Sequence, residues 1–448
     1  MINRRHFIGT SLGAGAALAL TPEWLRAFQQ QTGKLIQRAV PSSGELLPVI
    51  SFAPRPTAPP APGPTPAMPT DVPAAKEVLK AFVDNGGKVV DVLHGGPIGE
   101  QAARTAAVEL GIQDKFFWTT PLSVNVPVLP GYAGPPVKPD PAAVRAAMEE
   151  KFAAFKVNTI DLVMVSAGAE MSVHLGVLRE MKKEGKVRYV GVHDLMFPPN
   201  QPTPAPPTAR LESIIRSEQI DFVGTDYSVG DRRVEETLLP LALERKVAFM
   251  AYFPFDRGRM FKRIGTTPLP AWAAEFDAKT WAQFCLKYVL SHPAVIVARE
   301  GTTNAAHMLD NIGGGIGRLP SEAMRKRMAE LVDSFPPNPA PGPAQPPPPQ
   351  QQQAPQAPPL VLPAEILDRY VGEYTYVKTA QTVTLRRNGD RLLMKISGNA
   401  PEGPLAPRSE TRFQGPFGLL IEFQLDAQGK VTGAIVEQGP FRIPLQRN

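Results

Sequence analysis

Residues 160–192 read IDLVMVSAGAEMSVHLGVLREMKKEGKVRYVGV, and this stretch decides the fold. Apolar and β-branched residues fill Ile160–Val165 and again Val187–Val192, which predicts two buried strands. The pattern over Val177–Glu184 predicts a helix between them. A strand, a helix and a strand of this length indicate a parallel sheet with right-handed crossovers.

The same alternation continues on both sides of that unit. We expect further strands at Lys88–Leu93, Phe116–Thr119, Phe222–Thr225, Ala248–Tyr252 and Val295–Ala298, with further helices at Ala142–Phe155, Glu235–Glu244 and Thr280–Leu290. Seven or eight such repeats favour a closed (β/α)8 TIM barrel. In such barrels the chemistry lies where the strands end, so those positions are the candidates for function.

Proline marks the boundaries of the 448-residue chain. Its 51 prolines are more than double the usual share of about 5%, and they concentrate in Pro54–Pro73 and Pro336–Pro359. A shorter proline-rich patch, Phe197–Pro207, predicts an inserted loop. The predicted boundaries are a barrel at 38–335 with an insertion at 54–73, a semi-rigid linker at 336–360 and a second domain at 361–448.

The second domain changes to strict alternation. Thr382–Lys395 reads as one β-hairpin, and Phe417–Leu425 with Val431–Gln438 reads as another. Together with Leu367–Tyr374 at its head, the segment resembles the small lipocalin-like β domain appended to some exported bacterial enzymes. We therefore expect a small all-β, barrel-like domain after the TIM barrel.

The N-terminus carries a targeting pattern. Paired arginines, Arg4 and Arg5, precede an apolar run of small residues at Thr10–Leu20, so segment 1–30 resembles a twin-arginine signal. The resemblance implies export in the folded state to a periplasmic or extracytoplasmic location. The run is shorter than the roughly 20 residues of a membrane-spanning helix, but no clear A-x-A cleavage site follows. Retention as a membrane anchor therefore stays open.

Charge and cysteine content exclude some functions. The net charge of +6 is spread along the chain, with no run of five or more Lys or Arg, so nucleic-acid binding has little support. Cys285 is the only cysteine, which excludes an internal disulfide and a cysteine-based zinc site. Its apolar neighbourhood predicts a buried thiol.

Several short motifs occur in an order typical of one family. They are RAVPSSGELLP at 38–48, IDL at 160–162, GKVRYVGV at 185–192, DYS at 226–228, AYFP at 251–254 and GTTN at 301–304. In this order the motifs resemble those of the aldo/keto reductases over about residues 38–335. Members of that family reduce carbonyls with a nicotinamide hydride, using a tyrosine acid, a lysine and an aspartate that tune it, and a histidine.

The resemblance implies a degenerate catalytic tetrad. The aspartate survives as Asp91, and Glu100 keeps the glutamate of the family. The tyrosine, lysine and histidine positions fall on Gly96, Pro121 and Ser166. Without the tyrosine and the lysine, the usual proton relay cannot operate. A different reading takes Asp91 and Glu100 as a buried polar pair that supports the loop.

The cofactor positions are also partly replaced. The resemblance places Tyr252 where an aromatic stacks on the nicotinamide, and it implies NADP or NAD as cofactor. The adenosine and phosphate end corresponds to Thr302, His307, Asp310 and Asn311. Other cofactor positions hold His193-Asp194, Gly224 and Ser51–Pro54 instead of the family's residues. Two further readings stay open: Tyr252 as a packing residue, and Asn311 as a residue that pins a loop before Gly313–Gly315.

A replacement constellation is a third hypothesis. His94 and His193, with Asp194, Asp226, Arg299 and Glu300, are all expected at strand ends. Two histidines with carboxylates can bind a metal or transfer protons, but their spacing fits no metal motif, so we predict no metal site. The sequence leaves three functions: an exported oxidoreductase for a small carbonyl substrate, a catalytically inactive binding or scaffolding module, or a different enzyme built on the two histidines.

Overall fold

The computed structural model describes residues 33–54, 72–93, 96–124, 126–132, 134, 137–168, 170–195, 207–336, 360–398, 400–438 and 441–448. The predicted signal segment 1–30, residues 55–71 of the insertion, most of the linker and most of the inserted loop lie outside these ranges. The chain forms two compact units. The first unit comprises Met1–Leu122, Met148–Ala167 and Leu175–Asn338, and the second comprises Ser123–Ala147, Gly168–His174 and Pro339–Asn448.

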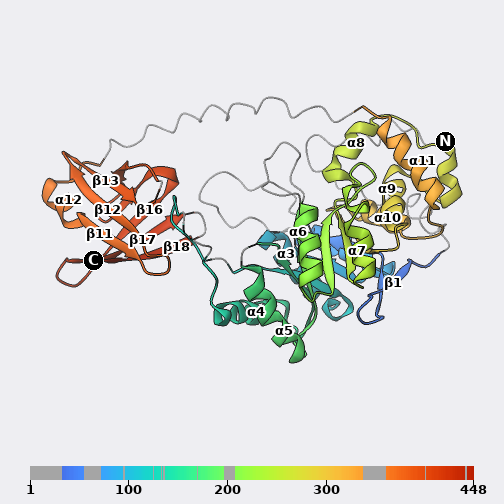
Figure 1. Cartoon of the computed structure of the whole chain (residues 1–448), viewed down its shortest axis with the longest axis horizontal. Helices are drawn as coiled ribbons and strands as arrows, with labels where there is room; N and C mark the ends of the chain where they lie inside the picture. The colour runs from blue at the N-terminus through green and yellow to red at the C-terminus, as the bar shows by residue number, and fades with distance from the viewer. Residues whose placement is uncertain are drawn as a thin grey trace. The chain divides into compact units, whose positions relative to one another are not determined.

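The first unit contains a closed parallel barrel (Figure 1). Its strands are β3 (Ile50–Ala53), β4 (Val89–Asp91), β5 (Phe117–Leu122), β6 (Ile160–Ser166), β7 (Val187–His193), β8 (Phe222–Asp226), β9 (Ala248–Tyr252) and β10 (Val295–Gly301). Each strand pairs in parallel with the next in the chain, and β10 pairs with β3 to close the ring. The predicted (β/α)8 barrel is confirmed.

Helices follow the strands along the chain. They are α2 (Val72–Asp84), α3 (Gly96–Glu109), α4 (Pro141–Phe155), α5 (Met171–Lys183), α6 (Pro207–Ser217), α7 (Leu238–Glu244), α8 (Arg259–Ile264), α9 (Trp281–Leu290), α10 (Ala305–Gly314) and α11 (Glu322–Asp333), with 3-10 turns η2 (Gln113–Lys115), η3 (Arg233–Glu235), η4 (Asp256–Gly258) and η5 (Ala271–Phe276). Because α2 begins at Val72, the last two residues of the predicted 54–73 insertion belong to a helix.

Large apolar side chains fill the barrel near the N-terminal ends of its strands. Phe117, Tyr189 and Phe222 pack ring against ring in this layer. A hairpin of β1 (Gln37–Ala39) and β2 (Leu46–Pro48) adds Val40 and Leu47 to the same cluster. The hairpin therefore completes the core at this end of the barrel. Cys285 is buried in α9, as predicted.

Two glycines of the run at 313–315, Gly314 and Gly315, allow α10 to pack closely against its neighbours. A β-carbon on Gly314 would lie 2.8 Å from Leu286, and one on Gly315 would lie 2.5 Å from Leu35. The helix α10 continues to Gly314, so the hypothesis that Asn311 pins a loop before the glycines is wrong. Glycine is required here because helix and barrel approach closely.

The C-terminal domain is a closed antiparallel barrel (Figure 1). Its elements are α12 (Ala364–Tyr370), β11 (Gly372–Tyr376), β12 (Gln381–Asn388), β13 (Arg391–Ile396), β14 (Gly403–Pro407), β15 (Arg412–Gln414), η6 (Pro416–Gly418), β16 (Leu420–Leu425), β17 (Val431–Gln438) and β18 (Phe441–Arg447). The all-β prediction and both hairpins are confirmed. The second hairpin begins later than predicted, because residues 416–418 form the turn η6.

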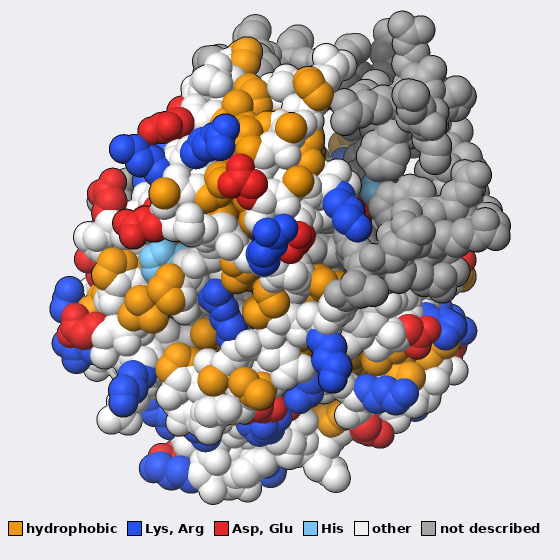
Figure 2. Space-filling model, turned by 90° about the vertical axis from the view of Figure 1, so that its right-hand side faces the viewer, with side chains coloured by type: hydrophobic (Ala, Val, Ile, Leu, Met, Phe, Trp, Pro, Cys, Tyr) orange, Lys and Arg blue, Asp and Glu red, His pale blue; other side chains and the backbone are white. Residues whose placement is uncertain are grey.

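The surface mixes charges of both signs. In the face drawn in Figure 2, basic and acidic side chains are interspersed, with no continuous basic stripe. Among the described residues, no helix is long and apolar enough to cross a membrane.

Candidate active site at the barrel mouth

Strand alternation brings an ion pair into the barrel. Asp91 lies two residues after the buried Val89 on β4, and Arg299 lies two residues after Val297 on β10, so both face inward. The Arg299 Nε lies 3.0 Å from the Asp91 Oδ2, and their side chains are 2% and 0% exposed. Asp91, which the resemblance assigns to the aspartate of the tetrad, is therefore paired with a buried arginine.

The electrostatics of this pair follow from burial. Desolvation raises the pKa of Asp91, while the Arg299 charge and a hydrogen bond from the Leu93 backbone N–H oppose that rise. Removing one partner of a buried pair leaves an uncompensated charge, which typically costs about 3–5 kcal/mol. Each buried charge is therefore stable only while its partner is present.

Glu100 does not pair with Asp91. Its carboxylate lies 3.4 Å from the Lys151 ammonium of α4 and 3.5 Å from Arg104 on its own helix. Lys151 also donates to the Thr120 hydroxyl at 3.0 Å. The hypothesis of a buried Asp91–Glu100 pair is therefore wrong, because each carboxylate has cations of its own.

Tyr252, the predicted nicotinamide-stacking residue, is enclosed at the end of β9. Its side chain is fully buried, and the Arg299 guanidinium lies 5.6 Å from the ring centre. A β-carbon on Gly224 would lie 2.5 Å from the phenol end of the ring. Burial raises the pKa of Tyr252, the Asp91 charge raises it further, and Arg299 opposes both. At neutral pH the phenol keeps its proton.

The three other positions that the resemblance assigns to the tetrad lie in or beside the barrel strands. Gly96 is the first residue of α3, Pro121 lies in β5 and Ser166 ends β6. Glycine and proline have no ionisable side chain, so neither position can supply the acid or the cation of the family's relay.

Of the two histidines of the alternative constellation, the structure describes only His193. His94 lies outside the described residues. His193 ends β7, and burial together with the Arg299 charge lowers its pKa to about 4, so its ring is neutral at pH 7. Within the described part of the chain, no group of three or more His, Cys, Asp or Glu side chains could hold a metal ion. The His94–His193 hypothesis stays a prediction.

The remaining charged residues of that constellation have separate partners. Asp194 accepts from the Arg210 Nε at 2.6 Å, and Asp226 accepts from Arg257 at 2.7 Å. Glu300, expected at the mouth, instead lies near Cys285 of α9. Burial raises the pKa of that thiol, and the Glu300 charge raises it further. Glu300 alternates with Arg299 along β10, so it points away from the barrel interior.

The residues predicted to bind the adenosine and phosphate groups of a cofactor form hydrogen bonds with other residues of the chain. The Asn304 N–H donates to the Thr302 Oγ1 at 3.0 Å, while the Asn304 side chain caps α10 by accepting from the Ala306 and His307 N–H groups. Asp310 accepts from the Thr280 hydroxyl and the Gln283 amide. Asn311 is buried within α10. Beside Thr302, between β3, α2 and α3, a cavity of about 10 Å³ remains, roughly the space of one water.

These contacts decide how well a dinucleotide fits. Tyr252 offers no open ring face, since Arg299 and the Gly224 backbone enclose it. Thr302 and Asp310 already have internal partners. Of the five residues predicted to bind a cofactor, only His307 is exposed. The described residues therefore do not fit a nicotinamide dinucleotide.

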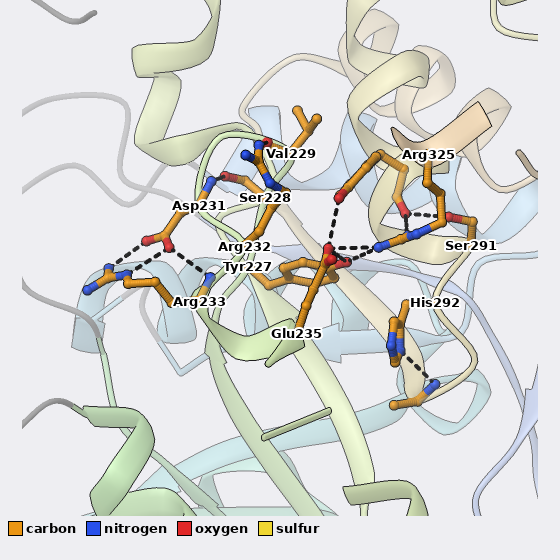
Figure 3. Close-up of polar contacts among 12 residues, drawn as sticks. Tyr227, Ser228, Val229, Asp231, Arg232, Arg233, Glu235, Ser291, His292 and Arg325 are labelled. Carbon is orange, nitrogen blue, oxygen red and sulfur yellow. Dashed lines mark hydrogen bonds and ion pairs between the residues drawn. The ribbon is translucent and has the colours of Figure 1, made fainter. Parts of the chain in front are cut away.

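A polar cluster that the sequence did not predict lies outside the barrel (Figure 3). The Glu235 Oε1 accepts from the Tyr227 hydroxyl at 2.6 Å, the Tyr288 hydroxyl at 2.8 Å and the Arg325 guanidinium at 2.7 Å. Arg325 also donates to the Ser291 hydroxyl at 2.7 Å. The cluster joins η3, α9 and α11 and lines a cavity of about 530 Å³. Its partners come from three separate regions of the chain, so no local motif could reveal it.

A closed parallel barrel with ionisable residues at its strand ends is a TIM barrel of the kind used by enzymes. Residues 65–330, more than half of the chain, match the aldo/keto reductase family. The chain therefore belongs to the aldo/keto reductase family of oxidoreductases. Residues 356–445 match a domain of unknown function, DUF3471.

Individual relatives are distant. A soybean (Glycine max) protein named probable aldo-keto reductase 1 is 23% identical over 235 residues, which cover 46% of this chain and 64% of that protein. The chain thus spans less than two thirds of this relative.

Two solved structures are similar to part of this chain. The glycerol dehydrogenase AKR11B4 from Gluconobacter oxydans aligns with a TM-score of 0.50 at 18% identity, covering 68% of this chain and 97% of that enzyme. An aldo-keto reductase from Klebsiella pneumoniae, solved with NADPH, has a TM-score of 0.49 at 18% identity, covering 66% of this chain and 96% of the enzyme.

Proposed function

We propose that this member of the family does not reduce carbonyls and that its barrel serves as a binding or scaffolding module. One observation carries the proposal: Arg299 pairs with Asp91 inside the barrel and covers Tyr252. The only tetrad residue that survives is thereby committed to an internal partner.

The chemistry of the replaced positions supports the same conclusion. Carbonyl reduction needs a proton donor within hydrogen-bond reach of the oxygen that gains charge, with a neighbouring cation that lowers its pKa. Gly96 and Pro121 offer neither group. Tyr252, the phenol nearest to Asp91 and Arg299 in this site, is fully buried and has a raised pKa.

A cofactor titration combined with a turnover assay tests the proposal. NADPH and NADH are titrated to millimolar concentration against the purified chain and followed by fluorescence. Small aldehydes and ketones are then supplied as substrates. We expect no turnover above the protein-free rate. Saturable carbonyl reduction by the wild-type chain would overturn the proposal.

A second candidate is an oxidoreductase that reduces a small carbonyl compound with NADP or NAD. It is favoured by the same three residues, because Asp91, Arg299 and Tyr252 bring a carboxylate, a cation and a phenol together. If this candidate is correct, Tyr252→Phe loses at least 100-fold in turnover while the protein remains folded. Equal turnover in wild type and Tyr252→Phe would exclude Tyr252 as the acid.

We also propose export by the twin-arginine pathway, supported by Arg4, Arg5 and the apolar run that follows. Replacing both arginines with lysine should leave the protein in the cytoplasm, whereas the wild-type chain reaches the periplasm or the cell exterior. Fractionation of the exported protein between membrane and soluble material then decides whether the segment stays as an anchor. Export that is unchanged in the double lysine variant would refute the proposal.

A further inference from the structure

A distant segment completes the core of the C-terminal barrel. Leu129 lies in the connection between β5 and α4, yet it belongs to the second unit and is only 1% exposed. Its side chain is part of the same buried cluster as Tyr376, Val383 and Ile396. The antiparallel barrel therefore encloses a leucine that its own sequence does not supply.

The side-chain amide of Gln381 holds the backbone of that leucine. The Leu129 N–H donates to the Gln381 Oε1 at 2.8 Å, and the Gln381 Nε2 donates to the Leu129 carbonyl at 3.0 Å. One amide thus satisfies both backbone groups of one residue, as a neighbouring strand would. Such contacts recognise backbone, while the apolar pocket recognises the side chain.

The surroundings of Gln381 hold its amide in place for these two hydrogen bonds. It is 4% exposed, and among the described residues 360–448 it is the only Asn, Gln, Ser, Thr or charged side chain that is buried. The Thr379 hydroxyl donates to the Gln381 Oε1 at 3.3 Å and so orients the amide. Without Leu129 the amide would lose both backbone partners inside an apolar core, which is unfavourable.

The segment has a defined shape where it is bound. The Tyr132 N–H donates to the Leu129 carbonyl at 3.3 Å, and Gly131 has a φ of 80°. With Pro130 at the second position, residues 129–132 have the features of a type II turn. A β-carbon on Gly398 would lie 2.1 Å from the Gly131 carbonyl oxygen, so the turn touches the barrel backbone directly.

We propose that the C-terminal barrel is a peptide-binding module whose ligand is a leucine followed by a Pro-Gly turn. In this chain the ligand is the chain's own segment Val126–Tyr132, bound in cis.

Hydrogen exchange on the full chain tests the contact in a mild variant. In the wild-type protein we expect slow exchange of the Leu129 amide. In Gln381→Ala that amide should exchange at least tenfold faster, while β16 and β17 keep their protection. Gln424→Ala, on the exposed side of β16, is the matched control and should leave Leu129 unchanged. Equal exchange at Leu129 in wild type and Gln381→Ala would overturn the proposal.

A binding experiment tests recognition itself. In a full-length variant, residues 126–132 are replaced by a Gly-Ser linker of equal length, and the synthetic peptide VPVLPGY is added at up to millimolar concentration. We expect saturable binding by this variant, at least tenfold weaker binding of the Leu→Ala peptide and much weaker binding by the wild-type chain, whose site is filled. Equal binding of both peptides by the folded variant would overturn the proposal. A wild-type dimer that dissociates in Gln381→Ala would replace the cis ligand with a second copy of the chain.

Discussion

The chain contains two closed eight-stranded barrels that both have an apolar core but differ in the charged groups buried inside. In the parallel barrel, the ends of β4 and β10 bring a carboxylate and a guanidinium into the interior beside a buried phenol. In the antiparallel barrel, the core is a cluster of aliphatic and aromatic side chains in which Tyr370 stacks on Phe423 with ring centres 4.1 Å apart. Gln381 is the buried amide of that core.

The difference teaches how each interior is stabilised. Apolar burial contributes about 25 cal/mol per Å² without any directional partner, so the antiparallel core is stabilised by the area that its side chains bury. The buried ion pair stabilises only while both charges are present, since desolvation opposes each charge alone.

The largest expected effect is in the apolar barrel. Phe423→Ala removes a ring that contacts Tyr370, Phe413 and Tyr374. We expect a loss of about 4 kcal/mol in the free energy of unfolding of the C-terminal domain, as for other large-to-small core substitutions. Differential scanning calorimetry should show the transition of that domain at a lower temperature.

Tryptophan fluorescence separates the two units in this experiment. Trp118, Trp272 and Trp281 all lie in the first unit, and the second unit contains no tryptophan. The fluorescence transition should therefore stay unchanged in Phe423→Ala. A parallel shift of both transitions would show that the two barrels do not unfold independently.

The next largest effect is expected in the parallel barrel. Arg299→Met leaves the fully buried Asp91 carboxylate without its cation. We expect a loss of about 3 kcal/mol in the free energy of unfolding, measured by urea denaturation with tryptophan fluorescence. The double variant Asp91→Asn/Arg299→Met removes both charges and should recover most of the loss. If the double variant is as unstable as Arg299→Met, loss of the Asp91 counter-charge does not explain the lower free energy of unfolding.

The sequence predicted both folds because periodicity is a local property. Strands such as Ile160–Val165 and the hairpin at Thr382–Lys395 carry their pattern within a few residues, and the structure has strands and a hairpin there. Boundaries are harder to predict: the pattern predicts Phe417 in a strand, but residues 416–418 form a 3-10 turn. The existence of an element follows from its pattern, but its ends depend on turns.

The site was predictable only by position. The strand pattern located Asp91 and Tyr252 on strands, as the structure has them, but not their partners. Arg299 follows Asp91 by more than 200 residues, and the two meet because β10 and β4 are both neighbours of β3. The Leu129–Gln381 contact is equally remote in sequence. The first pair meets because the barrel closes and the second because a connecting segment enters the antiparallel barrel, and no local pattern encodes either event.

A smaller effect is expected at the Glu235 cluster outside the parallel barrel. Glu235→Gln removes the counter-charge of Arg325, which is held among Tyr227, Tyr288 and Ser291. We expect a loss of about 2 kcal/mol, typical of a hydrogen-bonded charged group that loses a partner. The exposed neighbour Glu236 provides the control, and Glu236→Gln should leave the urea midpoint unchanged. Equal midpoints for both variants would show that the cluster does not stabilise the barrel.

The smallest effect is a pH dependence that only the parallel-barrel unit should show. Burial raises the pKa of Asp310 from 3.8 to about 6, although hydrogen bonds from Thr280 and Gln283 lower it in part. Between these two values the folded chain holds a proton that the unfolded chain has released. The contribution of Asp310 is therefore complete below pH 4 and is lost as the pH rises through 6.

With allowance for partial exposure, the change between pH 4 and pH 7.5 is about 1–2 kcal/mol. Asp310→Asn keeps an acceptor for Thr280 and Gln283 but cannot ionise, so its urea midpoint should exceed that of the wild type at pH 7.5 and match it near pH 4. The exposed Asp84 serves as control: Asp84→Asn should follow the wild-type pH profile. If Asp310→Asn has the same pH profile as Asp84→Asn, Asp310 is ionised at neutral pH without cost, and the charged state of this residue is accommodated between α9 and α10.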